Sequence, residues 1–458
     1  MDEKPWTDPG DGTRAPGEAV EPAESFSTPL SEDAGTGAVR PDDGGTRPAT
    51  TPAEPALLEV AWPMPADKLD PDAARVASRL AGAGHQAYLV GGCVRDLLFG
   101  ARPKDFDVAT SAHPNEIRRL FRNCRIIGRR FRLAHIHFRE KIIEVATFRA
   151  PLPVSETATD EVELIRDDNV FGTAEEDARR RDFTFNALFY DVDRQVILDY
   201  VGGVADVERR VVRTIGDPNV RMREDPIRML RAVRLAARLG CRIDDDSLRA
   251  IRAYRHEITR AAAPRIIEDL LRMFRGGAIA PAFELMLETG ILEVVLPELH
   301  AHLSEPGATD EAEALRAVLR QADAWTRSGR ELTTPVQLSL LLAPVVMTAL
   351  LRQAGDARRY DNGELAVSLL RPIAQRLSVS KRDAERVRQI LLTLGKLLPD
   401  QRRRRGGSTI ARRAYFPETL DVFELMCLAT GDHLEEAARW RRRALETEGA
   451  AAAPSSRP

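Results

Sequence analysis

The spacing of apolar residues changes twice along this chain, and each change marks a different kind of segment. Residues 1–56 are rich in Pro, Gly, Thr, Ser and acidic residues and have almost no periodic apolar positions. Such a segment buries too little apolar surface to offset its ordering entropy, so we predict a disordered acidic tail. We expect order to begin near Leu69, because "DPDAARVASRLAGAG" has an acidic first turn, apolar Val76 and Leu80 and a glycine stop, a pattern typical of a helix.

From residue 86 to about 215 the apolar runs are short, β-branched or alternating, which predicts strands. The runs are AYLV, FDVAT, CRIIG, AHIHF, KIIEVATF and VILDYV, and HPNEIRRLF has the pattern of a helix with a proline near its start. The stretch from Ala150 to about Thr173 is polar and acidic, and we expect a mobile loop there. These signals predict a head of strands and helices at 69–215.

After residue 216 the strand signals end, and apolar residues recur at helical spacing between Gly and Pro. We predict a helical neck at 216–275, a helical body at 276–448 and a disordered end at 449–458. The predicted fold class is therefore α+β, with a small mixed sheet and helices in the head and an all-helical body. We find no internal repeat.

The cysteines and the apolar runs bear on the cellular compartment of the protein and on the kind of site it can form. The four cysteines, Cys93, Cys124, Cys241 and Cys427, form no CxxC pair and have no histidine cluster beside them. We interpret them as isolated reduced thiols, which favours a cytoplasmic protein and argues against a zinc site. No apolar run is long enough to span a bilayer, and the N-terminus lacks the pattern of a secretory signal.

The net charge of −3 hides an uneven distribution of charge. Residues 1–60 carry thirteen acidic and four basic side chains, so the rest of the chain has a net charge of about +6. An acidic tail thus masks a mildly basic remainder, and the near-neutral total does not exclude a nucleic-acid partner.

Candidate chemistry lies in "YLVGGCVRDLLFGARPKDFDVAT", residues 88–110. On a strand, Asp105 and Asp107 would point to one face, because side chains alternate between the two faces. Two close carboxylates repel each other, and Mg²⁺ relieves that repulsion while also binding substrate phosphates. The spacing therefore predicts a magnesium site for phosphoryl transfer, where two such ions stabilise the attacking and leaving oxygens.

The glycines upstream complete this candidate site. Gly91 and Gly92 have no Cβ, so their backbone can closely approach a triphosphate. Their N–H groups and the start of the next helix suit an anion, and Arg95 adds positive charge. A DxD motif alone more often occurs by chance than as a metal site, and a glycine pair alone is more often a simple turn. Their succession on a strand, a turn, a helix and a second strand is far more specific.

A third carboxylate would complete the metal site, and two residues are candidates. Glu144 lies on the apolar run "KIIEVATFR", where an unpaired acid is costly. Asp182 follows three arginines in "EEDARRRDFTFNALFYD". The alternatives are an edge-strand acid facing water for Glu144, and a helix N-cap or an ion pair with the arginines for Asp182. The sequence does not separate these interpretations.

Several of these segments together carry a resemblance to a known family. They are "LVGGCVRDLLFG…KDFDVAT", "EVATFR", "RRDFTFNAL", "ILDYVGGVADVERRVVRTIGDP" and "REDPIRMLRAVRLAARLG". In this order they resemble the class II tRNA nucleotidyltransferase/bacterial poly(A) polymerase family, relatives of the polymerase β-type nucleotidyltransferases. The resemblance covers nearly all of residues 70–275, and the helical remainder resembles the family's RNA-binding body more loosely.

The resemblance implies roles for individual residues. It implies metal binding by Asp105 and Asp107, triphosphate binding by Gly92 and Arg95, and a ribose contact at Arg181 and Asp182. In the poly(A) polymerases, the aspartate at the position of Asp182 is counted with the catalytic carboxylates. The family's EDxxR motif, which reads the incoming base through its Watson–Crick edge, falls on Asp225 and Arg228, and Arg231 and Arg234 continue its arginine series.

Helix geometry limits the last of these roles. On a helix beginning at Asp225, the side chains of Asp225, Arg228 and Arg231 drift by about 60° per step and share a broad face. Arg234 then lies nearly opposite Asp225 and serves RNA binding or structure. The alternative for Asp225 and Arg228 is an ordinary surface ion pair between them.

The family contains poly(A) polymerases and CCA-adding enzymes, and the segment "IIGRRFRLAH" resembles the poly(A) branch. In this segment Arg129, Arg130 and Arg132 add positive charge that can hold an RNA 3′ end; the alternative is a solvated basic strand. Arginine clusters in the body, such as "QRRRRGG", suit contacts with the RNA backbone.

The resemblance thus implies a template-independent polynucleotide adenylyltransferase that uses Mg²⁺ and adds AMP from ATP to RNA 3′ ends. The RNA belongs to mRNA, decay intermediates or tRNA, and we expect no membrane partner. The first alternative is a CCA-adding, or CC- or A-adding, tRNA nucleotidyltransferase. The remote alternative is an inactive RNA-binding protein on the same scaffold, against which the intact Asp105 and Asp107 pair speaks.

Overall fold

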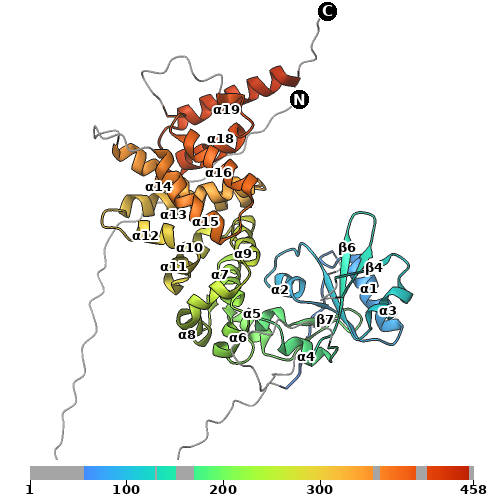
Figure 1. Cartoon of the computed structure of the whole chain (residues 1–458). Helices are drawn as coiled ribbons and strands as arrows, with labels where there is room; N and C mark the ends of the chain where they lie inside the picture. The colour runs from blue at the N-terminus through green and yellow to red at the C-terminus, as the bar shows by residue number, and fades with distance from the viewer. Residues whose placement is uncertain are drawn as a thin grey trace, which may run out of the picture. The chain divides into compact units, whose positions relative to one another are not determined.

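The computed structural model describes residues 56–65, 67–128, 132–150, 170–353, 362–398 and 410–452. The predicted acidic tail and most of the predicted mobile loop lie outside these residues. The described chain begins with a mixed sheet and its helices and continues as a series of helices, as Figure 1 shows. The predicted α+β fold class, with a mixed-sheet head and a helical body, is confirmed.

One eight-stranded sheet organises the head, in the strand order β1-β8-β7-β2-β3-β6-β5-β4. All neighbouring strands are antiparallel except β3 and β6, which are parallel. The strands are β1 (Leu58–Ala61), β2 (Ala87–Val90), β3 (Asp107–Thr110), β4 (Cys124–Ile127), β5 (Leu133–His137), β6 (Ile142–Thr147), β7 (Phe189–Asp191) and β8 (Val196–Asp199).

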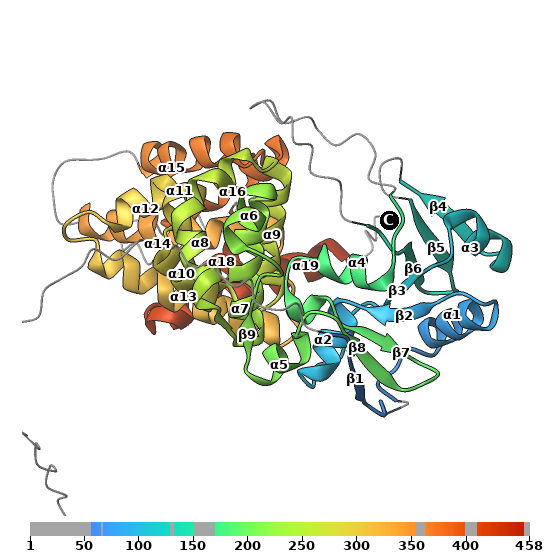
Figure 2. The ribbon, with the colours of Figure 1, turned by 90° about the horizontal axis from the view of Figure 1, so that it is seen from below.

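Two helices cover one face of this sheet, and on the other face Ala174 and Ala178 form a second buried cluster with residues of β2, β3, β7 and β8. Helix α1 (Pro71–Gly82) packs against β2 and β3, and α3 (Pro114–Leu120) packs against β4 and β5 (Figure 2). Apolar Val76 and Leu80 of α1 are fully buried, as their spacing predicts. The start of α1 is fixed by Asp70, whose side chain accepts hydrogen bonds from the backbone N–H groups of Asp72 and Ala73.

Two strands of this sheet were not predicted from the pattern, and one of them corrects the start of order. Strand β1 lies ahead of Leu69, where order was expected to begin, and it pairs with β8 from Leu58↔Asp199 to Ala61↔Val196. Strand β7 is only three residues long. Runs this short carry too little periodicity to be recognised, and each becomes a strand because an exposed sheet edge or a neighbouring strand supplies its hydrogen bonds.

Between the sheet and the long helices lie short elements that connect the head to the neck. They are α2 (Gly92–Leu98), α4 (Ala174–Arg179), the 3₁₀ turn Thr184–Asn186, α5 (Gly203–Glu208), and the parallel pair β9 (Val211–Val212) and β10 (Arg242–Ile243). The neck and body follow as α6 (Pro218–Glu224), α7 (Ile227–Leu239), α8 (Asp245–Tyr254), the 3₁₀ turn Arg255–Arg260, α9 (Ala263–Arg275), α10 (Ile279–Thr289), α11 (Ile291–Val295), α12 (Pro297–Leu303), α13 (Thr309–Arg327), α14 (Thr334–Gln353), α15 (Asn362–Arg376), α16 (Lys381–Leu394), α18 (Phe416–Thr430) and α19 (Leu434–Ala452).

The last helix corrects another predicted boundary. Helix α19 continues to Ala452, so the predicted disordered end at 449–458 begins inside a helix. Alanine has the highest helix propensity of all amino acids, so the run of alanines at the end of α19 explains why the helix does not stop earlier. None of the described helices is both long enough and apolar enough to cross a membrane.

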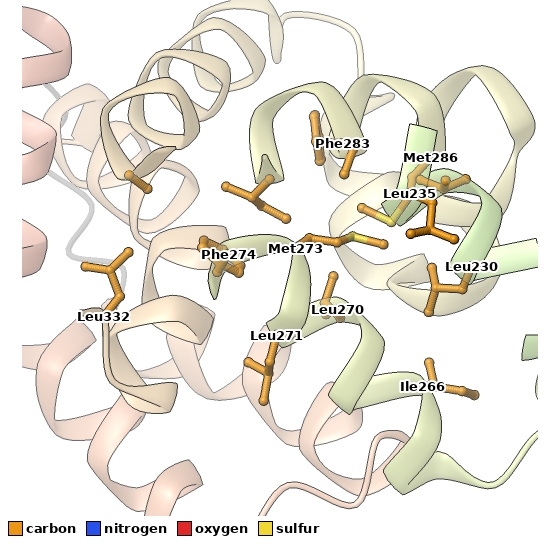
Figure 3. Close-up of a cluster of buried hydrophobic side chains, with 14 of the residues drawn as sticks. Leu230, Leu235, Ile266, Leu270, Leu271, Met273, Phe274, Phe283, Met286 and Leu332 are labelled. Carbon is orange, nitrogen blue, oxygen red and sulfur yellow. The ribbon is translucent and has the colours of Figure 1, made fainter. Parts of the chain in front are cut away.

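A continuous apolar core joins the neck to the body. Helices α9 and α10 both pack against α7, and Figure 3 shows their side chains meeting in one cluster. The labelled members are Leu230 and Leu235 of α7, Ile266, Leu270, Leu271, Met273 and Phe274 of α9, Phe283 and Met286 of α10, and Leu332. Helix α9 is therefore held firmly against α7, the helix that carries Arg228 and Arg231.

We predict that Leu270→Ala lowers the free energy of unfolding by about 2–5 kcal/mol, because it removes a fully buried side chain and leaves a cavity. Leu445→Ala makes the same chemical change at a side chain that is 61% exposed and should cost less than about 0.5 kcal/mol. Urea unfolding followed by circular dichroism measures both variants, and equal losses would contradict the assignment of this core.

Candidate active site

The register of the sheet brings two acidic residues together on the face opposite α1 and α3. In the parallel pair of β3 and β6, Asp107 is directly opposite Glu144. Side chains at directly paired positions point to the same face, so the two carboxylates are neighbours there. Their chain neighbours Val108 and Val145 are buried on the other face.

Asp105 lies outside the strand, which corrects the expectation that one strand carries both aspartates. Strand β3 begins at Asp107, and its pairing with β2 starts at Val90↔Asp107. Gly91 follows Val90 with a φ of +74°, so β2 turns away at that point. Residues 105 and 106 therefore have no strand beside them on that side, and Asp105 is an exposed residue just before β3.

The electrostatics of Asp107 suit a divalent cation. Desolvation by the surrounding protein and the negative charge of Glu144 raise the pKa of Asp107 to about 6, and Asp105 adds to this effect while Arg181 opposes it. Concentrated negative charge of this kind is what a bound Mg²⁺ neutralises, and Mg²⁺ usually takes one or two carboxylates together with substrate phosphates. Among the described residues, no group of three or more His, Cys, Asp or Glu side chains forms a ready-made metal cage.

The two candidates for a third carboxylate have different surroundings. Glu144 is paired with Asp107 across the strands and approaches His135, with 3.5 Å between Glu144 Oε1 and His135 Nε2. Asp182 instead accepts hydrogen bonds from the Phe183 backbone and the Asn186 side chain, both at 2.9 Å, and lies 3.4 Å from an Arg231 nitrogen.

Glycine is required at the first position of the turn, residue 91. A Cβ at Gly91 would lie 3.1 Å from Nη1 of Arg181, and the positive φ would strain any other residue. At Gly92 an added Cβ would meet Arg95 at an ordinary 3.6 Å. Arg181 therefore lies against the turn, where Asp177 holds its guanidinium at 2.9 Å and Phe189 lies under it.

Arg95 is buried and already paired. Its Nε and Nη2 atoms donate to Asp96 Oδ1 at 2.9 and 2.7 Å, and Nη1 donates to Asn186 Oδ1 at 2.5 Å. The other oxygen of Asp96 accepts a hydrogen bond at 2.9 Å from Arg238 of α7. Asp96 and Asn186 were not among the predicted site residues, and the only signals for them were their positions beside Arg95 and in "RRDFTFNAL".

The expected Asp225–Arg228 arrangement is corrected. Helix α6 ends at Glu224 and α7 begins at Ile227, because Pro226 disfavours helical geometry at Asp225, whose φ and ψ are −138° and 90°. Arg228 donates to Glu224 at 2.7 Å and to the Arg221 carbonyl at 2.8 Å. Neither the single helix nor the ion pair between Asp225 and Arg228 is present.

Helix α9 supplies the partners that the sequence did not predict. Arg265 donates to both oxygens of Asp225, at 2.9 and 2.8 Å. Asp269 is 2.8 Å from Arg234 Nε and 3.8 Å from Arg231 Nε. Arg234 is therefore held by an internal ion pair with α9.

The predicted RNA-binding residues are only partly described. Arg129 and Arg130 lie outside the described residues, and Arg132 is exposed directly before β5. The four cysteines are free thiols, and burial raises the pKa of Cys93 to about 11 and contributes most to raising the pKa of Cys427 to about 12.

Two family models match this chain, one over the head and one over part of the neck and the start of the body. The model of the poly A polymerase head domain matches residues 87–213. The model described as the probable RNA and SrmB-binding site of polymerase A matches residues 240–303.

Curated relatives and a solved structure are similar over longer stretches. Poly(A) polymerase I of Escherichia coli O6:H1 is 44% identical over 257 residues, and the match spans only 55% of either chain. Poly(A) polymerase I of Salmonella typhi is 35% identical over 378 residues, 81% of each chain. The CCA-adding enzyme of Bacillus velezensis is 33% identical over 219 residues, 48% of this chain and 54% of that protein. The crystal structure of the Bacillus stearothermophilus CCA-adding enzyme with CTP has a TM-score of 0.60 and 25% identity, covering 82% of this chain and 83% of that one.

We predict that Asp107→Asn raises the melting temperature in EDTA at about pH 7.5. The folded pKa of about 6 lies above the ordinary value of 3.8, so the stability contributed by protonated Asp107 is present at low pH and lost as the pH rises through 6. The advantage of the variant should therefore shrink as the pH falls toward about 4.5.

Thermal unfolding of both proteins across this pH range measures the effect. Added Mg²⁺ should raise the melting temperature of the wild type more than that of Asp107→Asn, because a bound ion stabilises only a folded state that can hold it. A difference between the two proteins that stays constant with pH would contradict the crowding of Asp107.

Proposed function

We propose that this chain, which belongs to the class II nucleotidyltransferase family of poly(A) polymerases and CCA-adding enzymes, is a template-independent polynucleotide adenylyltransferase. In this proposal it adds AMP from ATP to RNA 3′ ends. The observation that carries the proposed chemistry is the Asp107–Glu144 pair on the sheet face opposite α1 and α3, with its raised Asp107 pKa, beside the Gly91 turn.

In the proposed reaction, the RNA 3′ oxygen attacks the α-phosphorus of ATP, the bond from that phosphorus to the bridging oxygen breaks, and pyrophosphate leaves. Mg²⁺, when bound, supplies a lowered pKa for the 3′-hydroxyl and neutralises charge on the phosphates. Asp105 and Asp107 are the proposed ligands, and the neighbour relation to Asp107 supports Glu144 as the third carboxylate. Asp182, tied to Asn186 and Arg231, is proposed to orient the ribose.

The triphosphate is proposed to lie over Gly91 and Gly92, next to Arg181. Arg95 is less free than its motif suggested, because Asp96 occupies two of its nitrogens. Its proposed role is therefore to set the positive potential of the turn and to exchange one hydrogen bond for a phosphate oxygen. Backbone N–H groups at the turn provide the remaining donors.

Selection of adenine without a template needs donors and acceptors that do not rearrange. The bidentate pair with Arg265 fixes Asp225, and contacts with Glu224 and a backbone carbonyl fix Arg228. Side chains held in this way offer one fixed set of hydrogen-bonding groups to a base, which supports a single-nucleotide product. The 44% and 35% identities to the two poly(A) polymerase I sequences support the same choice.

The second candidate function is CCA addition to tRNA. It is favoured by the solved structure of a CCA-adding enzyme that covers 82% of this chain at 25% identity. The chemistry at Asp107 would be the same, and only the nucleotide selection and the stopping point would differ.

The test incubates the full chain with a generic single-stranded RNA and with a tRNA lacking its CCA end, using each nucleoside triphosphate in turn. Long A-tails on the generic RNA are expected. Incorporation of C into the tRNA would establish the second candidate, and no extension of any RNA would remove both.

We predict that Asp107→Ala lowers the rate of AMP addition by at least about 10³-fold, because the reaction loses a metal-binding carboxylate next to the reacting phosphate. Asp246→Ala, at an exposed aspartate of α8, is the matched control and should retain activity. Initial rates on a labelled RNA measure both, and full activity of Asp107→Ala would overturn the assignment of the site.

We predict that Arg265→Ala relaxes nucleotide selection, because Asp225 loses both hydrogen bonds that hold it. The ratio of kcat/KM for ATP to that for CTP should fall by about tenfold, the equivalent of about 1.4 kcal/mol. Arg275→Ala removes another arginine of α9, which pairs with Glu268, and should leave the ratio unchanged. An unchanged ratio in Arg265→Ala would contradict a positioning role for Arg265.

A further inference from the structure

The most basic window of the head lies between the last turn of α3 and the end of β5. Residues 118–139 contain eight arginines and two histidines and no aspartate or glutamate. Most other arginines of the head, such as Arg95, Arg181 and Arg213, are held by nearby carboxylates. Within the part of the chain that the structure describes, none of the basic window's Arg118, Arg119, Arg122, Arg125 and Arg132 takes part in an ion pair.

Strand β4 places one of these arginines in line with the candidate active site. The register gives the pairs Arg125↔His135, His135↔Glu144 and Glu144↔Asp107 on four successive strands. Directly paired residues share a face, so these four side chains form a row across the sheet face opposite α1 and α3. The next row, which contains Ala134 and Val145, is buried on the opposite face.

The row has a gradient of charge. Its inner end carries two carboxylates, His135 lies beside Glu144 in the middle, and exposed Arg125 lies on β4, the edge strand of the sheet. Neighbouring strands are about 4.8 Å apart, so the backbone positions of Arg125 and Asp107 are about 14 Å apart, measured across the four strands. This length exceeds a single nucleotide and suits a short stretch of extended strand.

The charge along a nucleic-acid strand that ends in a free hydroxyl is complementary to the charge along this row. Its phosphates are attracted to arginines and repelled by Asp107 and Glu144, whereas its terminal 3′-hydroxyl carries no charge and can approach them. The opposite edge of the sheet does not offer this order of charges. On that side of Asp107 the same row continues through the apolar residues Val90, Phe189 and Leu198.

From these observations we propose that the β4 edge is the docking track for the RNA 3′-terminal segment, with Arg125 binding a backbone phosphate a few nucleotides upstream of the reacting end. The exposed Arg122, in the turn before β4, extends the track away from the sheet. The proposal rests on the proposed function for its choice of RNA, and it assigns the RNA path to residues of the head that carry no part of the metal or nucleotide site.

Binding measured without turnover tests the track. The full chain in EDTA is titrated into a fluorescein-labelled short single-stranded RNA, and anisotropy is followed at several salt concentrations. Arg125→Glu combined with Arg122→Glu should raise Kd by about 5–20-fold, and the salt slope should decrease by about 0.7 per lost phosphate contact. Arg209→Glu, at another exposed arginine of the head, makes the same charge change as the single variant Arg125→Glu, is the control for that variant, and should leave Kd within twofold of the wild type.

Kinetics and crosslinking locate the effect. The KM for RNA should rise in the double variant, while the KM for ATP and kcat at saturating RNA stay near the wild type. A 4-thiouridine placed two or three nucleotides from the RNA 3′ end should crosslink to the peptide 118–139, and one near the 5′ end should not. Unchanged RNA affinity, an equal loss in Arg209→Glu, or crosslinks confined to the helical body would each overturn the track.

These readouts separate the track from the proposed function. An absence of AMP addition by the wild type, combined with RNA binding that depends on Arg125, would remove adenylyl transfer and keep the track. Normal AMP addition by the wild type, combined with unchanged RNA affinity in the variant, would keep adenylyl transfer and remove the track.

Discussion

The turn at Gly91 is the constraint on which the candidate active site depends. Its positive φ ends β2 at Val90, and this fixes the last pair of β2 and β3 at Asp107. The same turn starts α2, which carries Arg95 and Asp96, and leaves room for Arg181 where a Cβ would intrude. One glycine thus determines where the carboxylate lies and which arginines surround the space above it, because any larger residue would need both a strained backbone and a displaced guanidinium.

Asp96 extends this constraint from the head to the neck. It is buried between Arg95 of α2 and Arg238 of α7, and each arginine donates to a different oxygen. A buried carboxylate with two cationic partners is satisfied only while all three groups stay in place, and loss of one partner leaves an uncompensated charge. The helix that carries Arg228 and Arg231 is therefore tied electrostatically to the helix that follows the glycine turn.

Helix α9 acts as a second layer behind Asp225 and Arg228, the residues proposed to select the nucleotide. Its apolar side is packed into the core shared with α7 and α10, and its polar side presents Arg265 to Asp225 and Asp269 to Arg234. Because the apolar contacts fix the position of the helix, its charged groups are held at defined distances from their partners. The proposed selection of a base without a template requires this kind of rigidity, since no paired strand would be present to correct a wrong nucleotide.

Residue patterns were sufficient for the strand–turn–helix–strand order around Gly91 and for most helices of the neck and body, because these features follow from local periodicity and from the special backbone of glycine. They wrongly placed Asp105 on one strand with Asp107, and they missed β10 within the neck. They did not separate Glu144 from Asp182 as a neighbour of Asp107, since that choice depends on which strands lie side by side. They also suggested a pair between Asp225 and Arg228, where the folded chain joins Asp225 to Arg265, forty residues away. Local spacing describes which side chains can meet within one element. Contacts between distant elements are decided by the register of the sheet and by the packing of helices, and only the tertiary structure contains that information.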